Sequence, residues 1–113
     1  MHLPEIDKYA HLDSPLHRWD ARAKLAFFDL GHVQLELIEP VGGPSTWQEF
    51  LDTKGEGVHH IAFNIEDMDA QVAMLEEKGM PLVQRGDFQG GCYSYIDSTA
   101  QLGVMIELLA HHS

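Results

Sequence analysis

The stretch "GEGVHHIAFNIEDMDAQVAMLEEKG", residues 55–79, decides the fold, because it predicts a β-strand followed at once by an α-helix. Residues 57–65 alternate along the chain as a strand does, with every second side chain on the same face. The helix begins after Asp67, which has the side chain of an N-cap, and ends where Gly79 supplies a C-cap glycine. Its apolar positions recur at helical spacing, at Met68, Val72 and Leu75.

Three further strands are predicted after this helix. They are expected at "PLVQRG" (81–86), at "GCYSYID" (91–97), which is rich in aromatic and β-forming residues, and at "LGVMIELLA" (102–110). Residues 57–110 are therefore predicted to form a complete β-α-β-β-β module.

The first half of the chain predicts strands and a short helix. The strands are expected at residues 5–13, 21–31 and 32–40. A tight turn at 29–32 joins the last two of them. In the helix that follows, Ser45 and Gln48 form a capping box, and Trp47 lies on the apolar face and is expected to pack rather than to bind a ligand.

Composition restricts the classes of partner. The chain has 113 residues, enough for one domain, with 7 Lys plus Arg against 18 Asp plus Glu and a formal net charge of -11. This charge argues against nucleic acid and anionic membrane surfaces as partners and leaves small molecules. The sequence shows neither a membrane-spanning stretch nor the apolar segment of a signal peptide, so we expect a cytoplasmic protein. Cys92 is the single cysteine, so neither an intrachain disulfide nor a thiolate cluster is expected.

An internal repeat relates the two halves. When "AFFDLGHVQLELI" is placed against "SYIDSTAQLGVMIELL", Asp29 falls on Asp97 and, after a longer turn in the second copy, Glu36 falls on Glu107. Repeated units of this kind pack against each other. Both aspartates follow strands and are expected to form turns. The two glutamates occupy the same place in the middle of a strand, which suggests that they converge.

Glu36, His60 and Glu107 are the candidate site residues, because each lies in mid-strand between apolar neighbours. A buried carboxylate needs a cation or hydrogen bonds, and one divalent metal compensates two carboxylates at once. Imidazole and carboxylate ligands suit Zn, Co, Ni, Mn or Fe(II). The alternative is that Gln34 and Glu36 simply lie on the wetted face of a half-buried strand. Strand alternation allows only one of the two histidines, His59 or His60, to face the site.

With these residues in view, the chain resembles the vicinal oxygen chelate superfamily, the group of glyoxalases, bleomycin-resistance proteins and extradiol dioxygenases. The resemblance is carried by "GEGVHHIAF", "GVMIELL" and "LGHVQLELIEP", and it is closest to the branch of methylmalonyl-CoA epimerases and glyoxalase-like proteins. It implies an α+β fold of paired βαβββ modules, forming a curled mixed sheet around one metal. It also implies that the last strand of the first module supplies Glu36, and that the second module supplies His60 and Glu107. The histidine that faces the site is then His60, so His59 is expected to point the other way.

The chain departs from this family at its start, where we expect the opening strand and helix of the first module, with their metal-binding histidine, to be lacking. A single domain over residues 1–113 is expected, with a partial first module and linker helix at 1–56 and the complete second module at 57–110. A sheet without its opening strand exposes an edge, so a homodimer is expected. Either another chain supplies the absent histidine or the site is completed without it.

The resemblance implies a metal-dependent isomerase, epimerase or lyase. Its substrate would be a small 2-oxo or acyl-thioester compound, converted through an enediolate or enolate with Glu36 or Glu107 as the base. A dioxygenase is less favoured by one His and two Glu, because it requires two His and one carboxylate. The alternatives are a metal-free binding protein of the resistance type and an inactive truncated homologue. Arg18 and Trp19 are candidate substrate contacts or ordinary loop residues.

Overall fold

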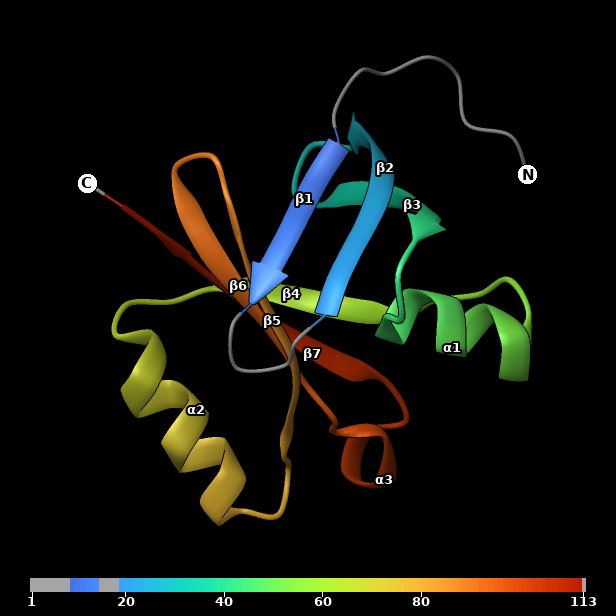
Figure 1. Ribbon diagram of the computed structural model, residues 1–113. Coiled ribbons are helices and arrows are strands. Elements are labelled where there is room, and N and C mark those ends of the chain that lie inside the picture. Colours follow the sequence, from blue (N-terminus) through green and yellow to red (C-terminus); the bar gives the residue numbers. More distant parts are fainter. Residues whose placement is uncertain (1–8, 15–18, 113) are drawn as a thin grey trace.

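Two β-sheets and the helices beside them make up the part of the chain that the computed structural model describes, residues 9–14 and 19–112 (Figure 1). The strands are Tyr9–Ser14 (β1), Trp19–Asp29 (β2), Gln34–Gly42 (β3), His60–Asn64 (β4), Leu82–Phe88 (β5), Gly91–Ile96 (β6) and Met105–His111 (β7). The helices are Thr46–Lys54 (α1), Met68–Glu77 (α2) and Thr99–Leu102 (α3). Figure 1 shows α1 and α2 far apart, on opposite sides of the molecule.

The strand order follows the two halves of the sequence. Strands β1, β2 and β3 form an antiparallel sheet in that order. The second sheet has the order β4-β7-β6-β5, with β4 parallel to β7 and the other neighbours antiparallel. The mixed α+β class and the β-α-β-β-β order of the second half are therefore confirmed. Among the described strands, β3 pairs with β2 alone and β4 pairs with β7 alone.

The boundaries of some elements differ from those predicted. Strand β4 begins at His60 rather than at residue 57, and the short helix α3 takes the place of the longer turn expected in the second repeat. Residues 5–8 of the first predicted strand lie outside the described residues. No helix in the described part of the chain has the length and apolar character needed to cross a membrane.

Local hydrogen bonds explain where helix α1 begins. Ser45 is its N-cap, and the Ser45 Oγ accepts a hydrogen bond of 3.0 Å from the backbone N–H of Gln48. The Gln48 side chain donates to Asp52 at 3.0 Å instead of reaching back to the cap. The predicted capping box is thus half formed, and it still satisfies a free N–H of the first turn.

Helix α2 is bounded by two residues with positive φ. Asp67 is the N-cap at φ 49°, and its Oδ1 accepts from the N–H of Ala70 at 3.2 Å. Gly79 follows the other end at φ 88°, while the N–H of Met80 donates to the carbonyl of Leu75 at 3.0 Å. This is a Schellman arrangement, which favours glycine at that position.

Strand β7 separates two hydrophobic cores. The first core contains buried Ala23, Trp47, Tyr93 and Tyr95, with half-buried neighbours that include Met105 and Leu109. The second core contains Met68, Val72, Ile96, Ile106 and Leu108. Because side chains alternate along a strand, Glu107 shares the face of Met105 and Leu109 and lies toward the first core. The face of the sheet that packs against α2 is thus separate from the face that carries Glu107.

Candidate metal centre

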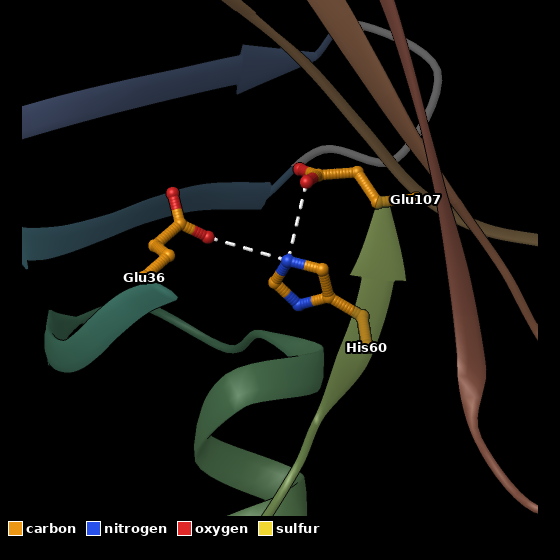
Figure 2. Close-up of side chains that lie close together, drawn as sticks. All are labelled: Glu36, His60 and Glu107. Atoms are coloured by element: carbon orange, nitrogen blue, oxygen red, sulfur yellow. Dashed lines mark ion pairs between the residues drawn. The ribbon is translucent and has the colours of Figure 1, made fainter. Parts of the chain in front are cut away.

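Three strands bring the candidate site residues together. Glu36 comes from the middle of β3, His60 is the first residue of β4, and Glu107 lies in β7. Figure 2 shows the two carboxylates reaching the same ring nitrogen of His60 from different directions. The parallel register pairs His60 with Met105, so the imidazole projects from the face that also carries Glu107. The two sheets therefore meet at this point.

The geometry of the cluster is tight. The Nε2 of His60 lies 3.2 Å from an oxygen of Glu36 and 3.2 Å from an oxygen of Glu107. One ligand atom from each residue falls within 4.8 Å of the others. The side chains are 21% exposed in Glu36, 10% in Glu107 and 9% in His60. The convergence of the two glutamates, suggested by the repeat, is thus present in the structure, and Glu36 does not lie on a wetted face.

His60 is surrounded by negative charge. Burial disfavours its charged form, but hydrogen bonds and Coulomb attraction to Glu107 and then Glu36 outweigh burial and raise the pKa of His60 to about 9. At neutral pH the ring therefore carries a positive charge between the carboxylates. The positive charge of protonated His60 thus compensates the carboxylates of Glu36 and Glu107, as a bound metal cation would.

His59 does not point away from the site, and this part of the sequence prediction is wrong. Its Nδ1 lies 2.9 Å from the Nδ1 of His60, and the two rings meet edge to face with centroids 5.1 Å apart. The reason is that strand pairing begins at His60, so strand alternation does not govern the residue before it. Burial and the nearby charge of His60 lower the pKa of His59 to about 3, and the backbone of Thr46 opposes this only in part. His59 is thus a neutral, packed imidazole.

Aromatic residues form a floor beneath both histidines. The ring of Tyr95 lies 4.9 Å from that of His59 and 5.0 Å from that of His60, measured between centroids. The Tyr95 hydroxyl accepts a hydrogen bond of 2.9 Å from the indole N–H of Trp47. Burial, with the charges of Glu107 and Glu36, raises the pKa of Tyr95 well above its usual range, so the phenol remains neutral. Trp47 packs as expected, and its indole N–H also holds the Tyr95 side chain in place.

A buried amide ties this floor to helix α1. The side chain of Gln84 accepts from the backbone N–H of Thr46 at 2.8 Å and donates to the hydroxyl of Tyr93 at 2.9 Å. Gln84 is 1% exposed, so both bonds lie within the core. Sequence reasoning did not single out Tyr95 or Gln84, although the aromatic pair in "GCYSYID" was a signal for such a layer.

The other residues noted in the sequence lie outside the cluster. Gln34 is exposed at the start of β3. Asp29 and Asp97 form turns, since Asp29 Oδ1 accepts from the N–H of Gly31 at 2.9 Å and Asp97 Oδ1 accepts from the N–H of Thr99 at 3.1 Å. Cys92 is half-buried beside the second core. Arg18 and the side chain of Trp19 lie outside the described residues.

The donor set of the cluster fits a divalent metal. It offers two carboxylate oxygens and one imidazole nitrogen, with the ligand atoms within 4.8 Å of one another, and these are ligand types that Zn²⁺ and similar ions accept. The Tyr95 ring lies beside the His60 ring, and Nε2 is the nitrogen of His60 directed at the carboxylates. Exposed clusters of acidic groups are common without a metal, but this one is largely buried and includes an imidazole.

Comparison with known sequences identifies relatives. The sequence profile of the Glyoxalase/Bleomycin resistance protein/Dioxygenase superfamily matches residues 6–95. The uncharacterized protein YqjC of Bacillus subtilis (strain 168) is 36% identical over 92 residues, covering 79% of this chain and 66% of that protein. An ethylmalonyl-CoA/methylmalonyl-CoA epimerase of Cereibacter sphaeroides is 28% identical over 85 residues, covering 74% of this chain and 63% of that enzyme. The chain thus spans less than two thirds of the length of these relatives.

A solved structure agrees with the fold. A methylmalonyl-CoA epimerase in complex with methylmalonyl-CoA and NH4+ superposes with a TM-score of 0.61 at 29% sequence identity. The match covers 82% of this chain and 69% of the epimerase. The paired-module architecture expected from the sequence resemblance is therefore confirmed.

Proposed function

Because the chain belongs to the Glyoxalase/Bleomycin resistance protein/Dioxygenase superfamily, we propose that it is a metal-dependent epimerase acting on a small acyl-CoA thioester. The observation that carries this proposal is the convergence of Glu36, His60 and Glu107 from three strands on one point. The epimerases among the relatives favour an isomerase over a lyase or a dioxygenase, and they favour a thioester over a 2-oxo compound.

The proposed chemistry is removal of a proton from the carbon beside the thioester carbonyl, followed by its return to the opposite face. A carboxylate is a suitable base for this step when the negative charge left on the substrate is stabilised. Glu36 is the more exposed of the two carboxylates, so it is better placed to reach a bound substrate than Glu107.

A divalent metal held by Glu36, His60 and Glu107 would supply Lewis-acid stabilisation of the negative charge on the carbonyl oxygen. The three residues hold such an ion only when His60 is neutral, because its Nε2 lone pair must be free. Metal binding at neutral pH therefore releases the proton that His60 otherwise keeps. The identity of the metal depends on geometry and availability.

The test combines metal content with proton exchange. The protein is purified without a metal-affinity column, its metal is measured by elemental analysis, and exchange of the C2 proton of methylmalonyl-CoA with D2O is followed by NMR. We expect about one divalent ion per chain in the wild type. Glu36→Gln and Glu107→Gln should each weaken metal binding and slow exchange roughly 100-fold or more.

Glu39→Gln is the matched control, because Glu39 is a half-buried carboxylate on the same strand and is not part of the cluster. It should keep both metal and exchange. A folded wild type without metal and without exchange would contradict the proposal and leave a metal-independent binding protein. Equal losses in Glu39→Gln and Glu36→Gln would mean that Glu36 acts through the stability of β3 and would contradict its role as a ligand.

We also propose that residues 1–113 form one domain, with a partial first module at 1–56 and a complete second module at 57–110, and that two copies form a homodimer. The single domain is supported by the first core, in which Ala23 and Trp47 pack with Tyr93 and Tyr95 across the two halves. The homodimer is supported by the edges of β3 and β4, since each strand has one partner among the described strands.

A further inference from the structure

His59 occupies an unusual position for a packed side chain, because one of its nitrogens contacts the candidate metal ligand directly. The His59 ring meets Phe50 edge to face at 5.6 Å and Tyr95 edge to face at 4.9 Å, measured between ring centroids. Its Nδ1 lies 2.9 Å from the Nδ1 of His60. The two aromatic contacts fix the plane of the His59 ring, and therefore the direction in which its Nδ1 points.

Packing alone does not account for a histidine at this position. The Nε2 of His59 is buried and makes no hydrogen bond of good geometry with the described residues, although the backbone of Thr46 lies near enough to the ring to affect its pKa. Burying a polar nitrogen without a partner costs free energy, which an apolar ring of similar size would avoid. The compensating contact is the one at Nδ1.

The chemistry of two imidazoles at this distance fixes which one donates. Two ring nitrogens 2.9 Å apart share one proton, so one is the donor and the other the acceptor. A metal at the Nε2 of His60 uses the lone pair there, and a neutral ring then carries its proton on Nδ1. The Nδ1 of His60 must donate, the Nδ1 of His59 must accept, and His59 keeps its own proton on Nε2.

We infer that His59 is the positioning residue of the metal centre: its Nδ1 accepts from His60 and so fixes the ring orientation and tautomer that direct Nε2 at Glu36 and Glu107. Figure 2 shows the geometry, with one nitrogen of His60 between the carboxylates and the other directed away from them. The inference rests on the proposed metal site. Groups that orient a ligating histidine in this way are usually carboxylates, carbonyls or water, and their loss weakens metal binding about 10- to 100-fold.

Two substitutions separate the acceptor from the packing. His59→Phe keeps the ring between Phe50 and Tyr95 and removes the acceptor. His59→Asn removes the ring and keeps an acceptor, because the side-chain oxygen of Asn lies near the position of the histidine Nδ1. The dissociation constant for Zn²⁺ is measured by competition with a chromophoric chelator, and folding of each metal-free variant is checked by thermal unfolding.

We expect His59→Phe to weaken Zn²⁺ binding about 10- to 100-fold while it stays folded, and His59→Asn to recover most of that loss. The spectroscopic readout is the ¹⁵N NMR of the imidazoles in the Zn²⁺-loaded wild type, where the Nδ1 of His59 should lack a proton and the Nδ1 of His60 should carry one. A protonated His59 Nδ1 would overturn the inference.

The outcomes distinguish this inference from the proposal on which it rests. A wild type that binds no Zn²⁺ overturns both. A wild type that binds Zn²⁺, together with a His59→Phe variant that binds equally well, overturns the role of His59 and leaves the metal site standing. Equal losses in the Phe and Asn variants, with both folded, show that the acceptor is not the cause and also overturn the inference.

Discussion

His60 and His59 are adjacent in the chain, and their environments shift their pKa values in opposite directions. The carboxylates stabilise the charged form of His60, whereas burial and the charge of its neighbour disfavour the charged form of His59. In an unfolded chain both groups would titrate near pH 6.5. The free energy of unfolding of the metal-free protein must therefore fall as the pH moves away from 6.5 in either direction.

We expect the metal-free protein to be most stable near pH 6.5. The stabilisation of the folded state by charged His60 is fully present below pH 6.5. It is lost as the pH rises from 6.5 through about 9, because over this range the folded state binds more protons than the unfolded state. The contribution of neutral His59 is fully present above 6.5 and is lost as the pH falls toward about 3. Each contribution reaches at most about 3–5 kcal/mol, and protein relaxation will reduce it.

The measurement is the free energy of unfolding by urea after chelation of metals, between pH 5 and pH 9. His60→Gln should flatten the alkaline side of the profile relative to the wild type, and His59→Phe should flatten the acidic side. His111→Gln is a control, because His111 is exposed. If the alkaline slope survives in His60→Gln, another group is responsible for it.

At the scale of elements, the start of helix α2 combines a cap with a backbone constraint. Asp67 has a positive φ of 49° and caps the N–H of Ala70. We expect Asp67→Ala to lower the free energy of unfolding by about 1–3 kcal/mol, because it removes the cap and places a Cβ in the left-handed region without a compensating hydrogen bond. Asp67→Gly should cost less, since glycine tolerates that φ.

Neither substitution should change metal affinity, because α2 packs with the second core. Thermal unfolding and Zn²⁺ titration of the same samples check both statements. A loss of metal binding in Asp67→Gly would mean that the two faces of the four-stranded sheet are coupled. Equal stability of the Ala and Gly variants would mean that the positive φ at this position does not affect the free energy of unfolding.

At the scale of the whole molecule, strand β4 is the surface that we expect to meet a second copy. Among the described strands its only partner is β7, and two of its apolar side chains are exposed, Ile61 by 43% and Phe63 by 49%. By strand alternation these two side chains point away from the face of His60. Unpaired edges with exposed apolar residues favour association.

We expect a mass in solution of twice the 12.7 kDa of one chain. The double variant Ile61→Lys with Phe63→Lys should give the mass of one chain, because lysines on an edge oppose strand pairing. Met74→Lys, on the exposed side of α2, is the control and should leave the dimer intact. Light scattering after size-exclusion chromatography gives these masses, and a wild type of 12.7 kDa would contradict the expectation.

The sequence predicts most of the elements because their signals are local. Ser45 and Asp67 mark the starts of helices, Gly79 marks an end, and alternation marks the strands. The convergence of Glu36 and Glu107 is predictable from the repeat, since equal positions in two packed units lie near their common centre. These inferences need only the order of residues along each element.

What the sequence does not predict depends on contacts between elements. The orientation of His59 is decided by Phe50 and Tyr95, which lie on other elements, and by the residue at which strand pairing begins. The sequence of β5 does not indicate that Gln84 is buried. Its hydrogen-bond partner, the N–H of Thr46, reaches it only because α1 packs nearby. Periodicity assigns a side chain to a face but does not identify what covers that face.

The cluster has a consequence for how this protein changes over time, because its residues belong to both copies of the repeat. Glu36 comes from the first copy, while His60 and Glu107 come from the second. The first half alone would carry Glu36 without the other two ligands, and the second half alone would carry His60 and Glu107 without Glu36. Selection on the chemistry must therefore act on the packing between the halves.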